Sequence, residues 1–327
     1  MPQTSTIDDR FRLSNIQIFP QRVSVDKIKL NTGTGSAIGH HGEVLQGAIE
    51  REGENIRRFL VTLPWPSIKS HSKFIPVYNG ELVIEQEWKS KSKRAAALTM
   101  LYLGIEGYGG FLEVVSDASA EMGLGSSTSD VVATIRAVAA AFHQSLTAIE
   151  ISEISVMAEI ASDSIMFEDQ AVVFCQREGI ILESLVQKLP PAFIIGFNTY
   201  PNGSGVSTIQ MPLPEYGWQE LGAFRPMIGS LRAAVRTQSI SLMGKVATAS
   251  AKLNQKHLPK PNFDGLLHLL SENGACGLQV AHSGSVAGFI FDPSDSNLAQ
   301  WINITKKGLT NLGIESMWYF NTAWESQ

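Results

Sequence analysis

A glycine-serine segment carries the strongest chemical signal in the sequence. Residues 122–129 read Met-Gly-Leu-Gly-Ser-Ser-Thr-Ser, and an apolar, alanine-rich stretch follows. Glycines let a backbone come close to a ligand, and the first N–H groups of a helix form an anion site. Hydroxyl side chains can bind phosphate oxygens or complete the coordination of Mg²⁺. We predict a phosphate-binding loop whose contacts are Gly123, Leu124, Gly125, Ser126, Ser127 and Thr128.

Two other interpretations of this segment fit the residues less well. A helix N-cap requires one hydroxyl residue, whereas four follow the second glycine here. A Walker A loop requires a lysine directly before its hydroxyl residue, and this segment has none. The segment instead resembles motif 2 of the GHMP kinase superfamily, P-x-x-x-G-L-G-S-S-A. Ser119 replaces the proline of that motif, and Thr128 replaces its last alanine.

Two further segments resemble one branch of that superfamily, the L-threonine kinases of cobalamin biosynthesis. The string HHGEVLQG at 40–47 is similar to the amino-terminal G-E-L-[IL]-Q-G motif of the branch. The string QVAHSGSVAGFIFD at 279–292 is similar to its carboxyl-terminal V-A-H-S-G-T-x-x-G motif. All three motifs occur in the order that the family has. The resemblance implies a substrate site formed by Gly42, Glu43, Gln46, His282, Ser283, Gly284 and Ser285.

The phosphoryl transfer that these motifs imply requires a carboxylate. Phosphoryl transfer to a hydroxyl needs an acid beside the attacking O–H or on the metal ion. Asp163 matches the aspartate of the E-P-T-D-S-x-x-F string in the threonine-kinase branch, and Asp169 resembles the aspartate of the galactokinase D-Q pair. We favour Asp163 as the catalytic residue and keep Asp169 as the alternative.

The same resemblance indicates where a metal ion would bind. Ile160 replaces the glutamate of the branch motif and Ala161 its proline, but Glu159 lies one residue earlier. We expect ATP and Mg²⁺ as cofactors, with Ser127 and Glu159 as the metal ligands. Asn198 stands where the family's D-x-G-G-x-V-x-T segment has an aspartate, so no acidic role is expected there.

The elements that must position these residues alternate irregularly between strand and helix, which indicates an α+β protein. For residues 30–47 we expect a strand, a glycine-rich turn, and a second strand or the start of a helix. Pro190 and Pro191 precede a buried strand and suggest a domain boundary. The remaining expected elements are strands at 57–65, 80–88 and 109–117, helices at 89–107, 127–142, 146–162, 225–255, 263–272 and 301–313, a hairpin at 171–184, and two strands flanking the glycine loop within 277–292.

The resemblance implies the GHMP kinase fold. We therefore expect an arm at 1–28, an amino-terminal domain at 29–187 like the second domain of ribosomal protein S5, and a ferredoxin-like carboxyl-terminal domain at 188–327. The basic cluster at 89–94 is expected to be the solvated first turn of a helix.

Histidines, cysteines and tryptophans suggest no metal or redox chemistry of their own. His40, His41 and His282 lack the spacing of a zinc site and are expected to be hydrogen-bonding residues in loops. Cys175 and Cys276 have apolar neighbours and are expected in the core. Trp65, Trp88 and Trp218 are expected in the core or in a lid.

Composition narrows the class of protein. Lys and Arg number 26 against 31 Asp and Glu, a net charge of −5, which argues against general nucleic-acid binding. The start of the chain lacks the pattern of a secretory signal, and no apolar run is long enough to cross a membrane. We expect a cytoplasmic protein with small-molecule partners, ATP and a hydroxylated amino acid, and leave a homodimer open.

The expected function is transfer of the ATP γ-phosphoryl group to the hydroxyl of an amino acid, with L-threonine as first choice. Homoserine, serine or another hydroxylated metabolite stays open as the acceptor. A third hypothesis is a catalytically silent ligand-binding member of the fold.

Overall fold

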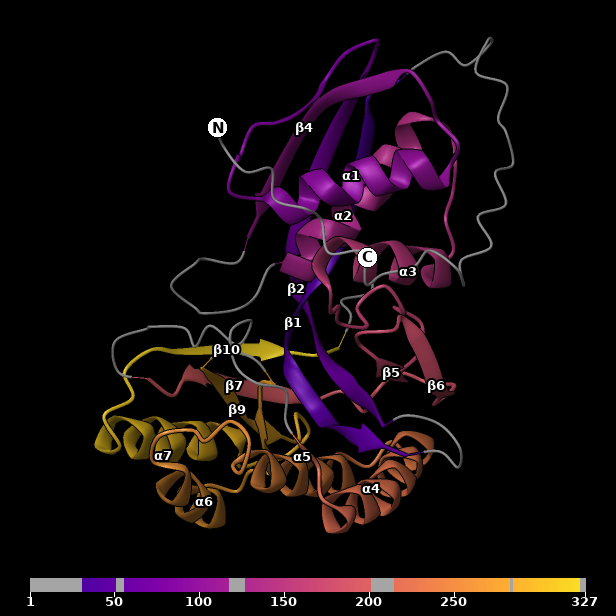
Figure 1. Cartoon of the computed structure of the whole chain (residues 1–327). Helices are drawn as coiled ribbons and strands as arrows, with labels where there is room; N and C mark the ends of the chain where they lie inside the picture. The colour runs from indigo at the N-terminus through magenta and orange to yellow at the C-terminus, as the bar shows by residue number, and fades with distance from the viewer. Residues whose placement is uncertain (1–30, 51–55, 118–126, 201–214, 283–284, 324–327) are drawn as a thin grey trace, which may run out of the picture.

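Two long strands connect the two lobes of the molecule (Figure 1). The computed structural model describes residues 31–50, 56–117, 127–200, 215–282 and 285–323. Strand β1 (Gly33–Ile49) pairs antiparallel with β2 (Arg57–Tyr78) from Gly33↔Phe74 to Ile49↔Arg57. The described strands form one sheet in the order β10-β7-β9-β8-β1-β2-β4-β3, so this hairpin holds the two lobes in a fixed relation.

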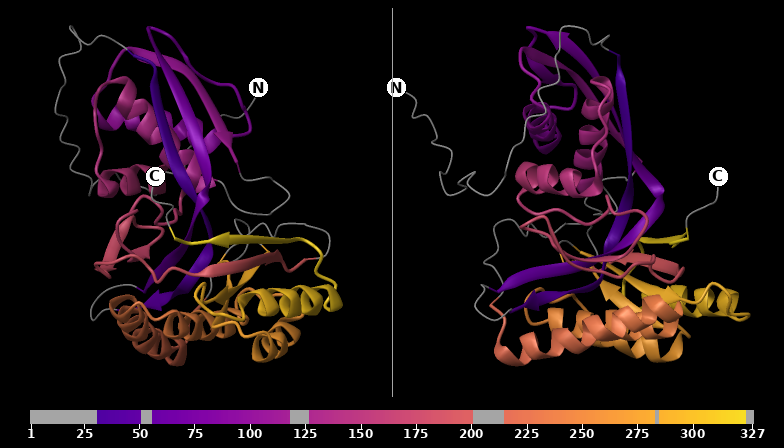
Figure 2. Two further views of the ribbon diagram at one scale, coloured as in Figure 1. Left: turned by 180° about the vertical axis from the view of Figure 1, so that it is seen from behind. Right: turned by 90° about the vertical axis from the view of Figure 1, so that its right-hand side faces the viewer.

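The upper lobe packs three helices against one face of its sheet (Figure 2). Strands β4 (Tyr108–Ser116) and β3 (Leu82–Ile84) continue the sheet beyond β2, and the helices are α1 (Ser90–Tyr102), α2 (Ser127–Ala141) and α3 (Ala148–Glu159). Helix α2 lies almost on the backbone of β1. A Cβ atom on Gly35 would stand 2.3 Å from the carbonyl oxygen of Ala133, so glycine is required for this approach.

The lower lobe has the β-α-β-β-α-β order of a ferredoxin-like domain, as expected. Its strands are β7 (Phe193–Asn198), β8 (Gly277–Val280), β9 (Val286–Phe291) and β10 (Met317–Asn321), which lie in the order β10-β7-β9-β8. One face is covered by α4 (Trp218–Thr237), α5 (Ile240–Asn254), α6 (Phe263–Glu272) and α7 (Leu298–Asn311), as Figure 1 shows.

A small hairpin, β5 (Val172–Cys175) and β6 (Ile180–Ser184), lies between the lobes and pairs with β2. The lower ends of β1 and β2 belong to the core of the lower lobe, where Val44 and Phe59 pack in one cluster with Ile194 and Phe224. The division of the chain at 187/188 stays a prediction, but the first part supplies strands to both cores.

The glycine-rich stretch at 30–47 is a single strand from Gly33 onward, so the expected turn within it is wrong. Two physical demands explain its glycines: the close approach of α2 at Gly33 and Gly35, and a bulged bend around Gly42. The expected strand at 80–88 shortens to β3, and the stretch at 225–255 contains two helices separated at Gln238. Strand β10, an edge strand, was not predicted.

The expected core positions are confirmed for Cys175 and Trp65 but not for Cys276, Trp88 and Trp218. Cys175 and Trp65 are buried in the core, whereas Cys276 is only partly buried and Trp88 and Trp218 are exposed. Within the described ranges, no helix has the length and apolar character that crossing a membrane requires.

Candidate active site

The amino terminus of α2 carries the first hydroxyl residues of the site. Ser127 and Thr128 begin the helix directly after residues 118–126, which lie outside the described part of the chain. The predicted phosphate contacts Gly123, Leu124, Gly125 and Ser126 therefore remain predictions. Ser127 Oγ donates a hydrogen bond of 2.8 Å to Glu159 Oε2, and Thr128 Oγ1 donates one of 2.8 Å to Glu159 Oε1.

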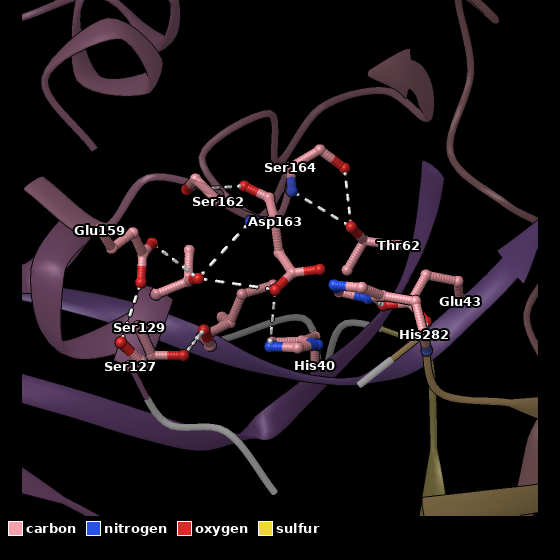
Figure 3. A network of polar contacts seen from close by, with 12 residues as sticks. His40, Glu43, Thr62, Ser127, Ser129, Glu159, Ser162, Asp163, Ser164 and His282 are labelled. Atoms are coloured by element: carbon pink, nitrogen blue, oxygen red, sulfur yellow. Dashed lines mark hydrogen bonds and ion pairs between the residues drawn. The ribbon is translucent and has the colours of Figure 1, made fainter. Parts of the chain in front are cut away.

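Glu159 is the last residue of α3, and its carboxylate points into the site (Figure 3). The helix ends at Ile160, which has a φ of 73° and a 54% exposed side chain. Glu159, rather than the residue at the family's glutamate position, therefore supplies the interior carboxylate. Burial raises its pKa, and the nearby charge of Lys91 acts in the opposite direction.

Lys91, in the first turn of α1, brings a cation to this carboxylate. Its Nζ donates to Ser127 Oγ at 2.9 Å and lies 3.7 Å from Glu159 Oε2. Lys89 makes a 2.9 Å ion pair with Asp130 on α2. The expectation of a solvated basic turn is therefore wrong for Lys89, whose side chain is 15% exposed, whereas Lys91 stays 42% exposed while it binds Ser127.

Asp163 follows α3 and is 7% exposed. Its Oδ2 lies 3.2 Å from His40 Nε2 and 3.5 Å from Thr128 Oγ1, whereas its Oδ1 makes no hydrogen bond with any described residue. Burial raises the pKa of Asp163, the charge of Glu43 adds to that shift, and His40 and His282 oppose it. A buried carboxylate with one free oxygen and a raised pKa has the properties of a general base.

A bulge in β1 brings His40 and Glu43 to the same side of the strand. Residues three apart on a regular strand point to opposite faces, but the pairing with β2 shifts register between His40 and Glu43. Gly42, inside this interval, has a φ of 67°. The bulge thus aims both side chains at Asp163.

Glu43 on β1 and His282, which follows β8, form a partly buried ion pair: the Glu43 side chain is 1% exposed and that of His282 is 20% exposed. His282 Nδ1 lies 2.7 Å from Glu43 Oε1, and the His282 N–H donates to Oε2 at 2.6 Å. Burial works to lower the pKa of His282, but the charge of Glu43 outweighs it and raises the pKa to about 9. Burial works to raise the pKa of Glu43, but the charge and hydrogen bonds of His282 hold it below its usual range. At neutral pH, His282 is therefore a cation fixed beside the site.

Replacement of Gly42 tests the bulge. A Cβ atom there would lie 2.9 Å from Ala281 Cα, and the positive φ disfavours any side chain. We expect Gly42→Ala to cost about 1–3 kcal/mol of stability and to reduce turnover by displacing Glu43. Thermal unfolding and kcat/KM measure both effects. Gly229→Ala on α4, where a Cβ meets open space, is the control and should not lower Tm. Equal Tm values for the two variants would contradict this role of Gly42.

The three histidines lie in two different environments. His41, on the opposite side of β1 from His40, is enclosed by Trp65, Trp318 and Phe320. Burial lowers its pKa to about 3, so it is a neutral core residue. His41 and His282 form hydrogen bonds, as expected, and His40 contacts Asp163, but His40 and His41 belong to a strand rather than a loop.

The other predicted site residues differ in their placement. Gln46 donates from Nε2 to the Val280 carbonyl at 3.1 Å and so ties β1 to β8. Ser285 is fully buried at the start of β9, and Ser283 and Gly284 lie outside the described residues. Asp169 is exposed, whereas Asp163 is buried in the polar network. Asn198 Oδ1 accepts a 3.0 Å hydrogen bond from the Tyr200 N–H, a structural role.

Two groups of donors could hold a metal ion. Ser127 Oγ and the Glu159 carboxylate are oxygen donors of the kind that Mg²⁺ prefers, and the Lys91 ammonium already lies against both. His40, Glu43 and Asp163 offer one donor atom each within 4.8 Å of one another. The imidazole in the second group suits transition metals better than Mg²⁺, so the first group fits Mg²⁺.

The sequence reasoning assigned no role at the site to His40 or Lys91. The signal for Lys91 was the basic cluster at the start of a helix. His40 could not be assigned from its spacing, because its contact with Asp163 joins β1 to the distant segment after α3.

Comparisons with known proteins agree with this architecture. Residues 90–176 match the family model of the GHMP kinases N terminal domain. An L-threonine kinase from Citrobacter freundii is 29% identical over 211 residues, which cover 61% of this chain and 68% of that relative. An L-threonine kinase from Salmonella typhimurium is 28% identical over 189 residues, covering 58% of this chain and 62%, less than two thirds, of that relative.

The solved structure of homoserine kinase from Cytophaga hutchinsonii superimposes with a TM-score of 0.63 at 15% identity, covering 90% of this chain and 97% of that chain. The chain thus has the GHMP kinase fold, and its residues 90–176 belong to the GHMP kinase N-terminal domain family. That segment contains Lys91, Ser127, Glu159 and Asp163, so the family match covers most of the polar network described above.

Proposed function

We propose that this protein transfers the γ-phosphoryl group of ATP to the side-chain hydroxyl of L-threonine and forms O-phospho-L-threonine. The observation that carries the proposal is the free Oδ1 of buried Asp163, next to the hydroxyl and carboxylate groups that begin α2 and end α3. The similarity to two L-threonine kinases supports threonine as the acceptor.

The residues around Ser127 fit the nucleotide end of the site. The first N–H groups of α2 offer an anion site for phosphate, and Lys91 adds a positive charge beside it. Ser127 Oγ and Glu159 would hold Mg²⁺. When bound, Mg²⁺ neutralises charge on the phosphates and orients them for in-line transfer. Lys91 would then exchange its contact with Glu159 for one with phosphate oxygens.

The residues around Asp163 fit the acceptor end. Asp163 Oδ1 would accept the proton of the substrate hydroxyl as the oxygen attacks phosphorus. His282, a cation at neutral pH because of its pairing with Glu43, would attract the negative charge of an amino-acid carboxylate or of the transferring phosphoryl group. The buried setting strengthens these charge interactions relative to those in water.

An ADP-release assay over a panel of hydroxy amino acids tests this function. With MgATP, we expect kcat/KM to be highest for L-threonine, followed by L-serine and L-homoserine. A preference for homoserine would keep the kinase and change its acceptor. ATP binding without ADP release for any member of the panel would contradict the proposal and favour a ligand-binding protein built on the kinase fold.

A further inference from the structure

His40 holds one oxygen of the Asp163 carboxylate and leaves the other free. Its Nε2 lies 3.2 Å from Asp163 Oδ2, while Oδ1 has no hydrogen-bond partner among the described residues. Figure 3 shows the imidazole below the carboxylate, with the contact running to a single oxygen. The two oxygens of this carboxylate are therefore distinct: one is anchored and one can react.

The position of His40 is imposed by the strand. Its backbone pairs with Pro64 of β2, just before the bulge at Gly42 that turns Glu43 to the same side of the strand. Little of the His40 side chain is exposed, 11%, so the contact with Asp163 is shielded from competing water. Because this contact is shielded, it restricts rotation of the carboxylate more than an exposed contact would.

Besides the 3.2 Å contact with His40, no described hydrogen bond of normal length fixes the Asp163 carboxylate. The next contact, from Thr128 Oγ1, is 3.5 Å long, and that hydroxyl already donates to Glu159 at 2.8 Å. The charged groups that act on Asp163 from its surroundings are those of Glu43 on β1, His282 after β8, and Glu159 at the end of α3. Glu43 also interacts directly with this carboxylate, and His40 is the basic side chain that contacts it, at 3.2 Å.

We propose that His40 is a positioning residue, which anchors Asp163 Oδ2 so that Oδ1 faces the hydroxyl of the phosphoryl acceptor. The inference rests on the proposed function and adds to it a residue without direct contact to the substrate. In the transfer step, the acceptor O–H bond breaks and its proton goes to Oδ1. The acceptor oxygen forms the new P–O bond, and ADP leaves with the electrons of the broken one. His40 takes no part in this proton transfer.

A double-mutant cycle separates positioning from general structural damage. We expect His40→Ala to lower kcat about tenfold to a hundredfold, the effect of losing one close polar contact to a charged group, while the KM for ATP stays unchanged. His40→Gln, which can place an amide N–H where Nε2 was, should recover most of that loss. His71→Ala, an exposed histidine on β2, is the matched control and should have wild-type kinetics.

The decisive comparison is made in the Asp163→Asn background. If His40 acts through Asp163, adding His40→Ala to Asp163→Asn should change kcat little further. Equal fold losses in both backgrounds, or a failure of His40→Gln to recover kcat while it folds normally, would overturn the inference.

A second readout does not need turnover. The changes in Tm caused by His40→Ala and by Asp163→Asn should not sum to the change in the double variant, since the two side chains are in contact. Additive Tm values would count against the contact itself. An inactive wild-type protein would contradict the proposed function but leave this second cycle as a test of the His40–Asp163 pair.

Discussion

Asp163→Asn is expected to lower kcat by about 10²–10⁴-fold, the range that a general base contributes. The amide has the size of the carboxylate and keeps one oxygen to contact His40, but it cannot take up the acceptor proton. Lys91 and Ser127, which we assign to the nucleotide end of the site, are bonded to each other and to Glu159, whereas Asp163 contacts Thr128. ATP affinity should therefore be nearly unchanged in this variant. Steady-state kinetics with separate determination of the KM for ATP measures both quantities.

The Tm of Asp163→Asn distinguishes a loss of catalysis from a loss of folded protein. Burial raises the pKa of Asp163, so the ionised carboxylate is less favourable in the folded than in the unfolded protein at neutral pH. Removal of that charge should leave Tm unchanged or raise it. A large fall in Tm would point to damage of the fold.

Asp169→Asn is the matched control, because its side chain is exposed and belongs to the same segment. We expect nearly wild-type kinetics for this variant. The reverse ranking, with Asp169→Asn inactive and Asp163→Asn active, would contradict the assignment of the base. A sharply increased Mg²⁺ requirement in Asp163→Asn would make Asp163 a metal ligand instead.

Glu159→Gln is expected to raise the Mg²⁺ concentration for half-maximal activity by at least about tenfold to a hundredfold, and to lower kcat as well. Removal of a group that only hydrogen-bonds to a metal ligand typically lowers metal affinity by this factor. Glu159 would be a ligand itself, so its replacement should lower the affinity at least as much. Glutamine keeps the size of the side chain and one carbonyl oxygen for Ser127 and Thr128 but removes the negative charge. Mn²⁺ binding followed by electron paramagnetic resonance provides a readout that does not depend on turnover.

Glu153→Gln is the matched control for this experiment. Glu153 lies on the same helix, is only partly buried, and has Glu150 as its charged neighbour. Its replacement should leave the Mg²⁺ dependence unchanged. If Glu159→Gln had the same Mg²⁺ dependence as wild type, the metal assignment to Ser127 and Glu159 would be wrong.

The sequence predicted the local elements and the family motifs well, because both depend on residues close together in the chain. The helix after the glycine-serine loop, the hairpin at 171–184 and the buried strand at 193–198 follow from apolar periodicity and turn residues. The single long strand β1 did not follow, because its glycines serve packing with α2 and the bulge at Gly42 instead of a turn.

The candidate site could be predicted only in part, since it depends on contacts between distant segments. Asp163, Glu159 and Ser127 were identified from motifs, and the structure places the latter two in direct contact. The contacts of His40 with Asp163 and of Lys91 with Glu159 join residues that are 123 and 68 positions apart by their numbers. No local pattern contains such pairs, so only the folded chain shows them.

Phosphorus NMR of a completed reaction tests the central claim most directly. The protein would be incubated with MgATP and excess L-threonine, and the products compared with those of Asp163→Asn under the same conditions. We expect the γ-phosphate signal to be replaced by an equal amount of a phosphomonoester that co-resonates with added O-phospho-L-threonine, and little product from the variant. Unchanged ATP, or conversion of its γ-phosphate to inorganic phosphate alone, would contradict phosphoryl transfer to threonine.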